Sequence, residues 1–128
     1  MILIIGGAYH NKLSYALKTY NILKEDMQDG KTCPLDEAFS KKGIYNLHLY
    51  IKRSLEQGFI NKENALSLVD NIGNKEIIIC DEIGSGIIPL DKFERSYRDI
   101  TGQIVSYISE KADQVIRIYY GIPSVLKE

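Results

Sequence analysis

Two short, uninterrupted aliphatic runs constrain the fold of this chain more than any other feature. They span residues 2–5 and 77–80, and isoleucine dominates both. A strand with one face in water alternates apolar and polar residues, so a continuous run predicts a strand buried on both faces, as in a parallel α/β sheet. A further apolar stretch, at residues 115–119, predicts a last strand.

Helical patterns separate these strands. Apolar residues at spacings of three and four predict helices over residues 12–24, 44–55, 61–73 and 91–113. The stretch 35–39 is compatible with a short helix. The polar residues 25–34, which include Asp29-Gly30, predict a turn and a loop.

Strands that alternate with longer helices imply right-handed crossovers and a parallel sheet. Ligands of such sheets bind beyond the carboxyl ends of the strands. We therefore expect the segments after Ile5, after Cys80 and after Tyr120 to converge on one edge.

The composition narrows the class of protein. With 128 residues, of which 45% are hydrophobic, the chain fits one compact domain over residues 1–128. A formal charge of −1 argues against a nucleic-acid partner. No apolar run approaches the roughly twenty residues that cross a bilayer, and no basic segment precedes residues 2–5. Two cysteines make no disulfide framework, so we expect a soluble cytoplasmic protein with Cys80 buried.

The segment between the first strand and the first helix resembles a phosphate-binding loop of pattern GxxxxGK[ST]. The groups that would bind phosphate are the backbone amides and side chains of Gly6, Gly7, Ala8, Tyr9, His10, Asn11 and Lys12.

This loop departs from the pattern at two positions. Asn11 replaces the second glycine, but asparagine tolerates a left-handed backbone. Leu13 replaces the hydroxyl residue that would bind Mg²⁺, and Ser14, about 100° further round the helix, is expected to face elsewhere. The alternative is a tight strand-to-helix turn with a solvent-facing Lys12.

The strand at residues 77–80 ends in two acids. An apolar strand followed by an acid has the form of a Walker-B strand, in which Asp81 would hold the metal and Glu82 would orient a nucleophile. The alternative is a pair of carboxylates that flank a strand end. His48 lies beside an apolar helical stripe, which predicts a partly buried, hydrogen-bonded histidine, whereas His10 is a candidate for contact with phosphate.

The C-terminal third resembles a known family. The resemblance rests on EIGSGIIP at 82–89, FERSYRD at 93–99 and GIP at 121–123, together with Gly102, Ala112, Asp113, Val115, Leu126 and Lys127. These residues are similar in order and spacing to the bifunctional adenosylcobinamide kinase / adenosylcobinamide-phosphate guanylyltransferase family of cobalamin biosynthesis. The resemblance implies a P-loop-like α/β domain, here reduced in size, with a parallel sheet flanked by helices. It also implies that the protein assembles as a trimer.

The same resemblance implies two activities, phosphoryl transfer to a corrinoid hydroxyl and guanylyl transfer through a covalent histidine. The chain departs from it in that residues 25–43, where that histidine belongs, contain neither His nor Arg. Val105 and Ser106 also replace an Asn-Gln pair. At most the kinase half is therefore expected.

Two hypotheses from different classes remain open. In the first, the chain binds GTP or ATP with Mg²⁺. Lys12 would then neutralise the phosphates, Asp81 and Glu82 would organise the metal and the attacking hydroxyl, and Arg98 would contact substrate or nucleotide. In the second, the chain is a non-catalytic binding or assembly module, and a kinase of another small alcohol is a third option. Whether residues 29–43 cover the site or shorten the fold stays open as well.

Overall fold

The computed structural model describes residues 1–7, 11–72, 74–83 and 91–128. The candidate residues Ala8, Tyr9 and His10 and the loop 84–89 lie outside these ranges. The strands are β1 (Ile2–Gly6), β2 (Met27–Asp29), β3 (Gly43–Tyr45), β4 (Ile77–Asp81), β5 (Gln114–Tyr119) and β6 (Ile122–Lys127). The helices are α1 (Lys12–Thr19), α2 (Leu47–Glu56) and α3 (Lys92–Lys111), with 3₁₀ turns η1 (Lys24–Asp26), η2 (Leu35–Glu37) and η3 (Ala65–Asn71).

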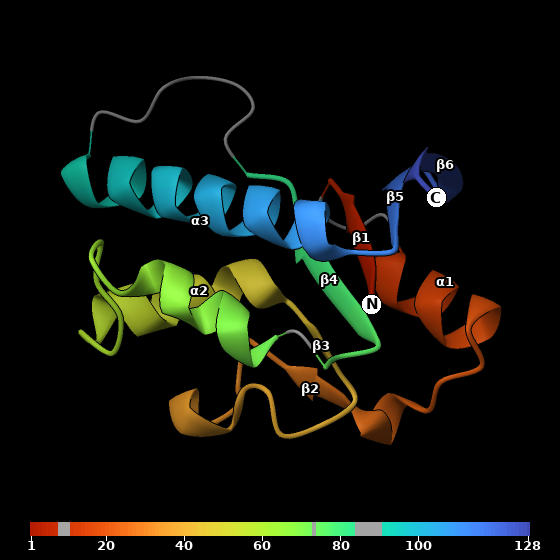
Figure 1. Cartoon of the computed structure of the whole chain (residues 1–128), viewed down its shortest axis with the longest axis horizontal. Coiled ribbons are helices and arrows are strands. Elements are labelled where there is room, and N and C mark those ends of the chain that lie inside the picture. Colours follow the sequence, from red (N-terminus) through yellow and green to blue (C-terminus); the bar gives the residue numbers. More distant parts are fainter. Residues whose placement is uncertain (8–10, 73, 84–90) are drawn as a thin grey trace.

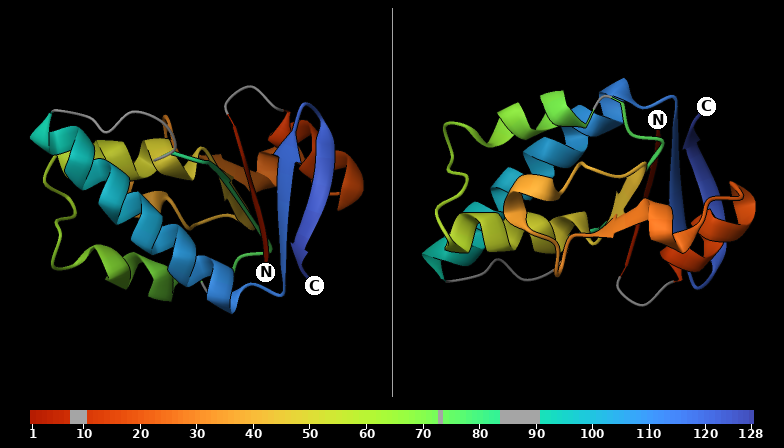
Figure 2. Two further views of the ribbon diagram at one scale, coloured as in Figure 1. Left: turned by 90° about the horizontal axis from the view of Figure 1, so that it is seen from above. Right: turned by 90° about the horizontal axis from the view of Figure 1, so that it is seen from below.

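One mixed sheet organises these elements, in the order β2-β3-β4-β1-β5-β6. The strands from β2 to β5 are parallel to their neighbours, and β6 closes one edge antiparallel to β5. Figure 2 shows β5 and β6 side by side beyond β1. The predicted fold class, a parallel α/β sheet flanked by helices, is therefore confirmed.

Helices cover both faces of the central strands. Leu3, Ile78 and Val115 belong to a core shared with α2 and α3, whereas Ile4 and Ile79 pack in a second core with α1. Figure 1 shows α2 and α3 on one side of β4 and α1 on the other. Because successive strand residues face opposite sides, two covered faces require apolar residues at every position. This explains the uninterrupted runs.

The largest difference from the sequence-based expectation concerns residues 25–45. The expected loop contains β2, and Ile44, expected in a helix, lies in β3, so that α2 begins only at Leu47. A three-residue strand is too short to show an alternation of apolar and polar residues. The strand character of β3 is therefore visible only in its pairing with β2 and β4. A Cβ on Gly43 would lie 2.6 Å from the carbonyl oxygen of Ile77 and 2.5 Å from the sulfur of Met27, so glycine is what lets β3 fit between its neighbours.

Other boundaries also moved. The first helix ends at Thr19 rather than near residue 24, and the third expected helix forms the shorter η3. The long helix is confirmed, with the Asp91 carboxylate accepting a hydrogen bond from the Glu94 amide at 3.1 Å.

Strand β6 was not expected. Tyr120 and Gly121 both have positive φ, at 53° and 75°, which is the geometry of a type I′ hairpin turn. Tyrosine is an unusual residue for this conformation, so the sequence gives no hairpin signal here. Within the described ranges, no helix combines the length and the apolar character needed to cross a bilayer.

Candidate functional site

The carboxyl ends of the three central strands meet at one edge, as predicted. Gly6 of β1 pairs with Asp81 of β4 and with Ile118 of β5. A Cβ on Gly6 would lie 2.2 Å from the carbonyl oxygen of Ile118, so no other residue fits at this crossing. Asn11 then adopts a left-handed conformation, with φ 56° and ψ 33°, directly before α1. The left-handed conformation expected to be tolerated at Asn11 is observed.

Lys12 and Asp81 form the centre of the site. The Lys12 side chain is only 6% exposed, and its Nζ lies 2.7 Å from Oδ1 of Asp81. The same ammonium group donates to the carbonyl oxygen of Gly7 at 2.6 Å. The alternative of a solvent-facing Lys12 is therefore wrong. The lysine that begins α1 and the acid that ends β4 are therefore in direct contact.

His48 fixes Asp81 from the α2 side. The Asp81 amide donates to Nδ1 of His48 at 3.2 Å, and Nε2 of the ring lies 3.4 Å from Oδ2 of Asp81. Because Nδ1 accepts, the neutral ring carries its proton on Nε2, facing the carboxylate. Burial lowers the pKa of His48, Lys12 lowers it further, and Asp81 opposes both. The predicted partly buried, hydrogen-bonded histidine is confirmed.

Glu82 is directed away from this pair. Its carboxylate accepts from Nε and Nη2 of Arg117, both at 3.0 Å, and from the Tyr119 hydroxyl. This contact with Glu82 raises the pKa of Arg117. Successive residues at a strand end point to opposite faces, so the structure does not bring Glu82 to Lys12 and Asp81. Its role as an orienter of the nucleophile stays a prediction without geometric support.

A cavity of about 670 Å³ opens beside the Lys12–Asp81 pair. It lies between the starts of α1 and α2 and the ends of β3 and β4, and Lys24 and Lys31 complete its wall. We call it the α1–α2 cavity. Ser14 lines it together with Leu13, whereas Ser14 was expected to face elsewhere. Every residue of the first turn of α1 from Asn11 to Ser14 lines this cavity. A rotation of about 100° along the helix therefore does not remove Ser14 from it.

The segment 29–43 has two functions in the structure. Lys31 reaches the α1–α2 cavity, whereas η2 packs against α2, where the Leu35 carbonyl accepts from the Tyr50 hydroxyl at 2.7 Å. Part of the segment therefore borders the site, and the rest covers the core.

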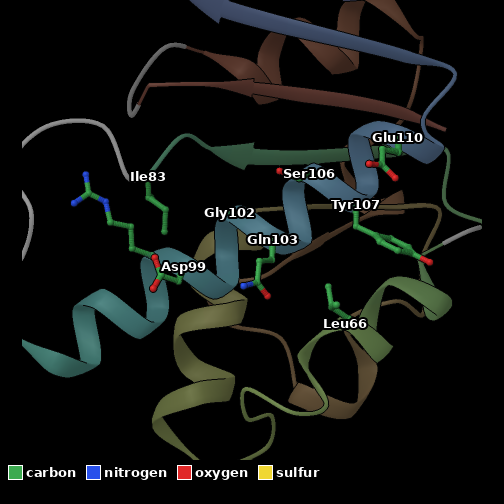
Figure 3. A pocket seen from close by; sticks show the side chains of 9 residues that line it. Leu66, Ile83, Asp99, Gly102, Gln103, Ser106, Tyr107 and Glu110 are labelled. Carbon is green, nitrogen blue, oxygen red and sulfur yellow. The ribbon is translucent and has the colours of Figure 1, made fainter.

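Arg98 lies elsewhere. It lines a second hollow along α3, with Asp99, Gln103 and Ser106 on the same helix. Figure 3 shows Gln103 and Tyr107 of α3 facing Leu66 of η3 across this hollow. The structure thus does not group Arg98 with Lys12 and Asp81, and its contact with nucleotide or substrate stays a prediction.

The residues present fit a magnesium ion that is held mainly by phosphates and water. Mg²⁺ in nucleotide sites typically takes one or two protein carboxylates, and Asp81 offers one at the edge where phosphates are expected. Leu13 offers no oxygen. Among the described residues there is no group of three or more His, Cys, Asp and Glu side chains that would form a metal cage.

The cysteines are buried thiols. Cys80 is fully buried, as expected, and burial raises its pKa to about 12. Cys33 lies in a polar stretch of sequence but is buried too, and burial raises its pKa. Arg53 beside Cys33 opposes this rise. Both thiols nevertheless lack the solvent access of a reactive cysteine.

Fold and site together define an α/β protein of the P-loop type, with a lysine at the start of the first helix and an acid at the end of a central strand. The sequence pattern of the cobinamide kinase / cobinamide phosphate guanyltransferase family matches residues 42–126, and the chain belongs to this family. The matched range includes Asp81 and His48 and begins after Lys12.

One curated relative is the bifunctional adenosylcobalamin biosynthesis protein CobU of Salmonella typhimurium strain LT2. The chain is 32% identical to it over 53 residues, which are 41% of this chain and 29% of the relative. The similarity therefore spans less than a third of that protein's length. The resemblance found in the sequence is confirmed at the level of the family.

Several residues in or next to the site had no signal in the sequence. Lys24 and Lys31, which line the cavity, were assigned only to a helix end and a loop, and Arg117 and Tyr119, which bind Glu82, were assigned only to a strand. Their positions near the site depend on β2, β3 and the register of β5, which sequence periodicity did not resolve.

Proposed function

We propose that this protein binds GTP or ATP together with Mg²⁺ and transfers the terminal phosphoryl group to a hydroxyl, as the kinase half of its family. The contact of Lys12 with Asp81 carries this proposal, because it joins the two groups that a P-loop kinase uses on the β- and γ-phosphates. Membership of the family supports a role in cobalamin biosynthesis, with a corrinoid side chain as one acceptor.

The phosphates would bind at the start of α1. Its first backbone amides lack partners within the helix, and no acidic residue occupies the first turn, so an anion is favoured there. The ammonium group of Lys12 would exchange the carboxylate of Asp81 for phosphate oxygens. This exchange keeps the buried lysine paired with negative charge throughout.

Asp81, released from Lys12, would hold the magnesium ion. When bound, Mg²⁺ neutralises the charge that develops on the transferred group. His48 keeps its contact with Oδ2 of Asp81, which leaves Oδ1 to face the cavity. The acceptor hydroxyl attacks the γ-phosphorus, so that a new O–P bond forms as the bond to the β-phosphate oxygen breaks. The hydroxyl proton passes to solvent, and the nucleoside diphosphate leaves.

Guanylyl transfer is not part of this proposal. The chain has two histidines. His48 is buried, and both of its ring nitrogens face Asp81, so it is poorly placed to attack a nucleotide.

A non-catalytic assembly role is the second candidate, and β6 supports it. Ile122, Val125 and Leu126 on this edge strand are 70%, 51% and 55% exposed, and exposed apolar residues that gather on one element offer a surface for a partner. A trimer, as the resemblance implies, would cover such a surface. Detection of a phosphorylated corrinoid after incubation with nucleotide and Mg²⁺ would exclude a purely non-catalytic role.

Calorimetry tests the proposal. We expect Mg²⁺-dependent heat of binding for GTP or ATP, and a loss of at least tenfold in affinity for Lys12→Met. Lys62→Met is the matched control, because Lys62 is exposed and lies outside the site. Circular dichroism of both variants checks that they are folded. Absence of heat at millimolar nucleotide, with Lys12→Met equal to the parent, contradicts the proposal.

A further inference from the structure

Strand β3 stops short of the end of β4, its neighbour in the sheet. The pairing of the two strands ends at Ile44 and Ile78, whereas β4 continues to Asp81. On the other side of β4, the amide of Glu82 donates to the carbonyl oxygen of Gly6 at 2.7 Å. Because the amides of successive strand residues point to opposite neighbours, the amide of Asp81 points to the β3 side, beyond the last pair of these strands.

The ring of His48 takes the place of the missing strand partner. Its Nδ1 accepts a hydrogen bond from the Asp81 amide at 3.2 Å, and the residue is 7% exposed. A shielded amide without an acceptor is costly, so Nδ1 does for Asp81 what a carbonyl group of a longer β3 would do. Nε2 of the same ring lies 3.4 Å from Oδ2 of Asp81. One side chain therefore contacts both the backbone and the carboxylate of Asp81, and Oδ1 is the oxygen that meets Lys12.

A further contact holds the histidine itself. The Tyr97 hydroxyl of α3 donates to the carbonyl oxygen of His48 at 3.0 Å, and both residues are buried. The ammonium group of Lys52, one turn further along α2, lies 5.8 Å from the centre of the Tyr97 ring. These contacts fix the first turn of α2 against α3. A chain of contacts thus runs from α3 through α2 to the acid at the end of β4.

We propose that His48 is a positioning residue for Asp81, held in place by Tyr97. This inference rests on the proposed function, in which Asp81 holds the magnesium ion. His48 fixes the backbone and one carboxylate oxygen of Asp81, so that Oδ1 stays available when Lys12 turns to the phosphates. Removal of a residue that orients a metal ligand typically weakens metal binding by roughly ten- to a hundredfold.

Two variants of nearly equal shape separate the polar contact of His48 from its packing. Leucine and asparagine have the same branching, but asparagine alone offers an oxygen that can accept from the Asp81 amide. Calorimetry measures the affinity for a non-hydrolysable GTP or ATP analogue, once with Mg²⁺ and once with EDTA. In His48→Leu we expect a loss of about tenfold or more with Mg²⁺ and an unchanged affinity with EDTA. His48→Asn should recover most of the loss.

Tyr97→Phe tests the support of the histidine. The variant removes a buried hydroxyl that donates to a carbonyl group. Tyr50→Phe is the matched control, because the Tyr50 side chain is also buried and its hydroxyl donates instead to the Leu35 carbonyl at 2.7 Å. We expect Tyr97→Phe to weaken binding with Mg²⁺ by roughly threefold, below the effect of losing the histidine, and Tyr50→Phe to leave it unchanged.

Nitrogen-15 NMR of the free protein gives a readout that needs no nucleotide. Because Nδ1 accepts, we expect the ring proton of His48 on Nε2. A proton on Nδ1 would overturn the inference, as would a parental affinity of His48→Leu with Mg²⁺ or equal losses with Mg²⁺ and with EDTA. Equal effects of Tyr97→Phe and Tyr50→Phe would overturn the role of Tyr97. If the parent binds no nucleotide, the proposed function fails, whereas the position of the ring proton still supports or overturns the hold of His48 on Asp81.

Discussion

The ammonium group of Lys12 lies 2.7 Å from the carboxylate of Asp81, and this contact joins the start of α1 to the end of β4. The pair sits where the sheet has its carboxyl edge, with Lys12 almost fully buried and Asp81 about 21% exposed. A buried lysine of this kind depends on its partner, because an unpaired charge in low dielectric is costly. In the proposed function, the same dependence would allow a phosphate group to take the place of the carboxylate.

Asp81→Asn should destabilise the fold. The substitution leaves the Lys12 ammonium group without an opposite charge, and we expect a loss of about 2–3 kcal/mol, below the value for a fully buried pair because water reaches Asp81. Urea denaturation measures this loss. The double variant Lys12→Met/Asp81→Asn should recover at least 1 kcal/mol, since no charge is then left buried. A double variant less stable than Asp81→Asn would contradict this account.

Leu13→Thr should strengthen nucleotide binding in the presence of Mg²⁺. The new hydroxyl follows Lys12, where a P-loop supplies an oxygen to the metal, and we expect at least a fivefold gain in affinity that disappears with EDTA. Ser14→Ala should leave the affinity unchanged. If Ser14→Ala instead removes the dependence on Mg²⁺, then Ser14, which lines the same cavity, supplies the hydroxyl.

Gly43→Ala should weaken the sheet between β2 and β4. The added methyl group would meet the Ile77 carbonyl oxygen at 2.6 Å, and relief of that clash requires the strands to separate. We expect a loss of roughly 2 kcal/mol or more by urea denaturation. Gly102→Ala in α3 is the matched control, because nothing lies within 4 Å of its Cβ position and alanine favours helix by about 1 kcal/mol. Equal effects of both substitutions would contradict the close approach at Gly43.

The free energy of unfolding should fall above pH 9 because of Cys80. Burial raises the pKa of this thiol from 9.0 to about 12. The unfolded chain therefore releases the proton near pH 9 while the folded chain retains it, and folding loses about 1.4 kcal/mol per pH unit between these values.

Cys80→Ala removes this titration but leaves the tyrosines in place. The difference in unfolding free energy between the parent and Cys80→Ala should therefore shrink from pH 9 to pH 11. A difference that stays constant over this range would show that Cys80 does not titrate with a raised pKa.

The sequence by itself determined the class of fold. It also determined that the lysine after the first strand and the acid at the end of a central strand lie close together. Uninterrupted isoleucine runs require two covered faces, and the helical spacing after residue 91 is long enough to be unambiguous. The closeness of Lys12, which follows β1, to Asp81, which ends β4, then follows, because the carboxyl ends of parallel strands share one edge.

Only the tertiary structure decided the remainder. Strands β2 and β3 have three residues each, so their backbone hydrogen bonds with neighbouring strands, rather than any local pattern, make them strands. The pleat at the end of β4 directs the side chains of Asp81 and Glu82 to opposite faces. The register of β5 then places Arg117 beside Glu82 as its partner. Lys24 and Lys31 line one cavity with the start of α1 because they flank β2, whose place at the sheet edge is set by its pairing with β3.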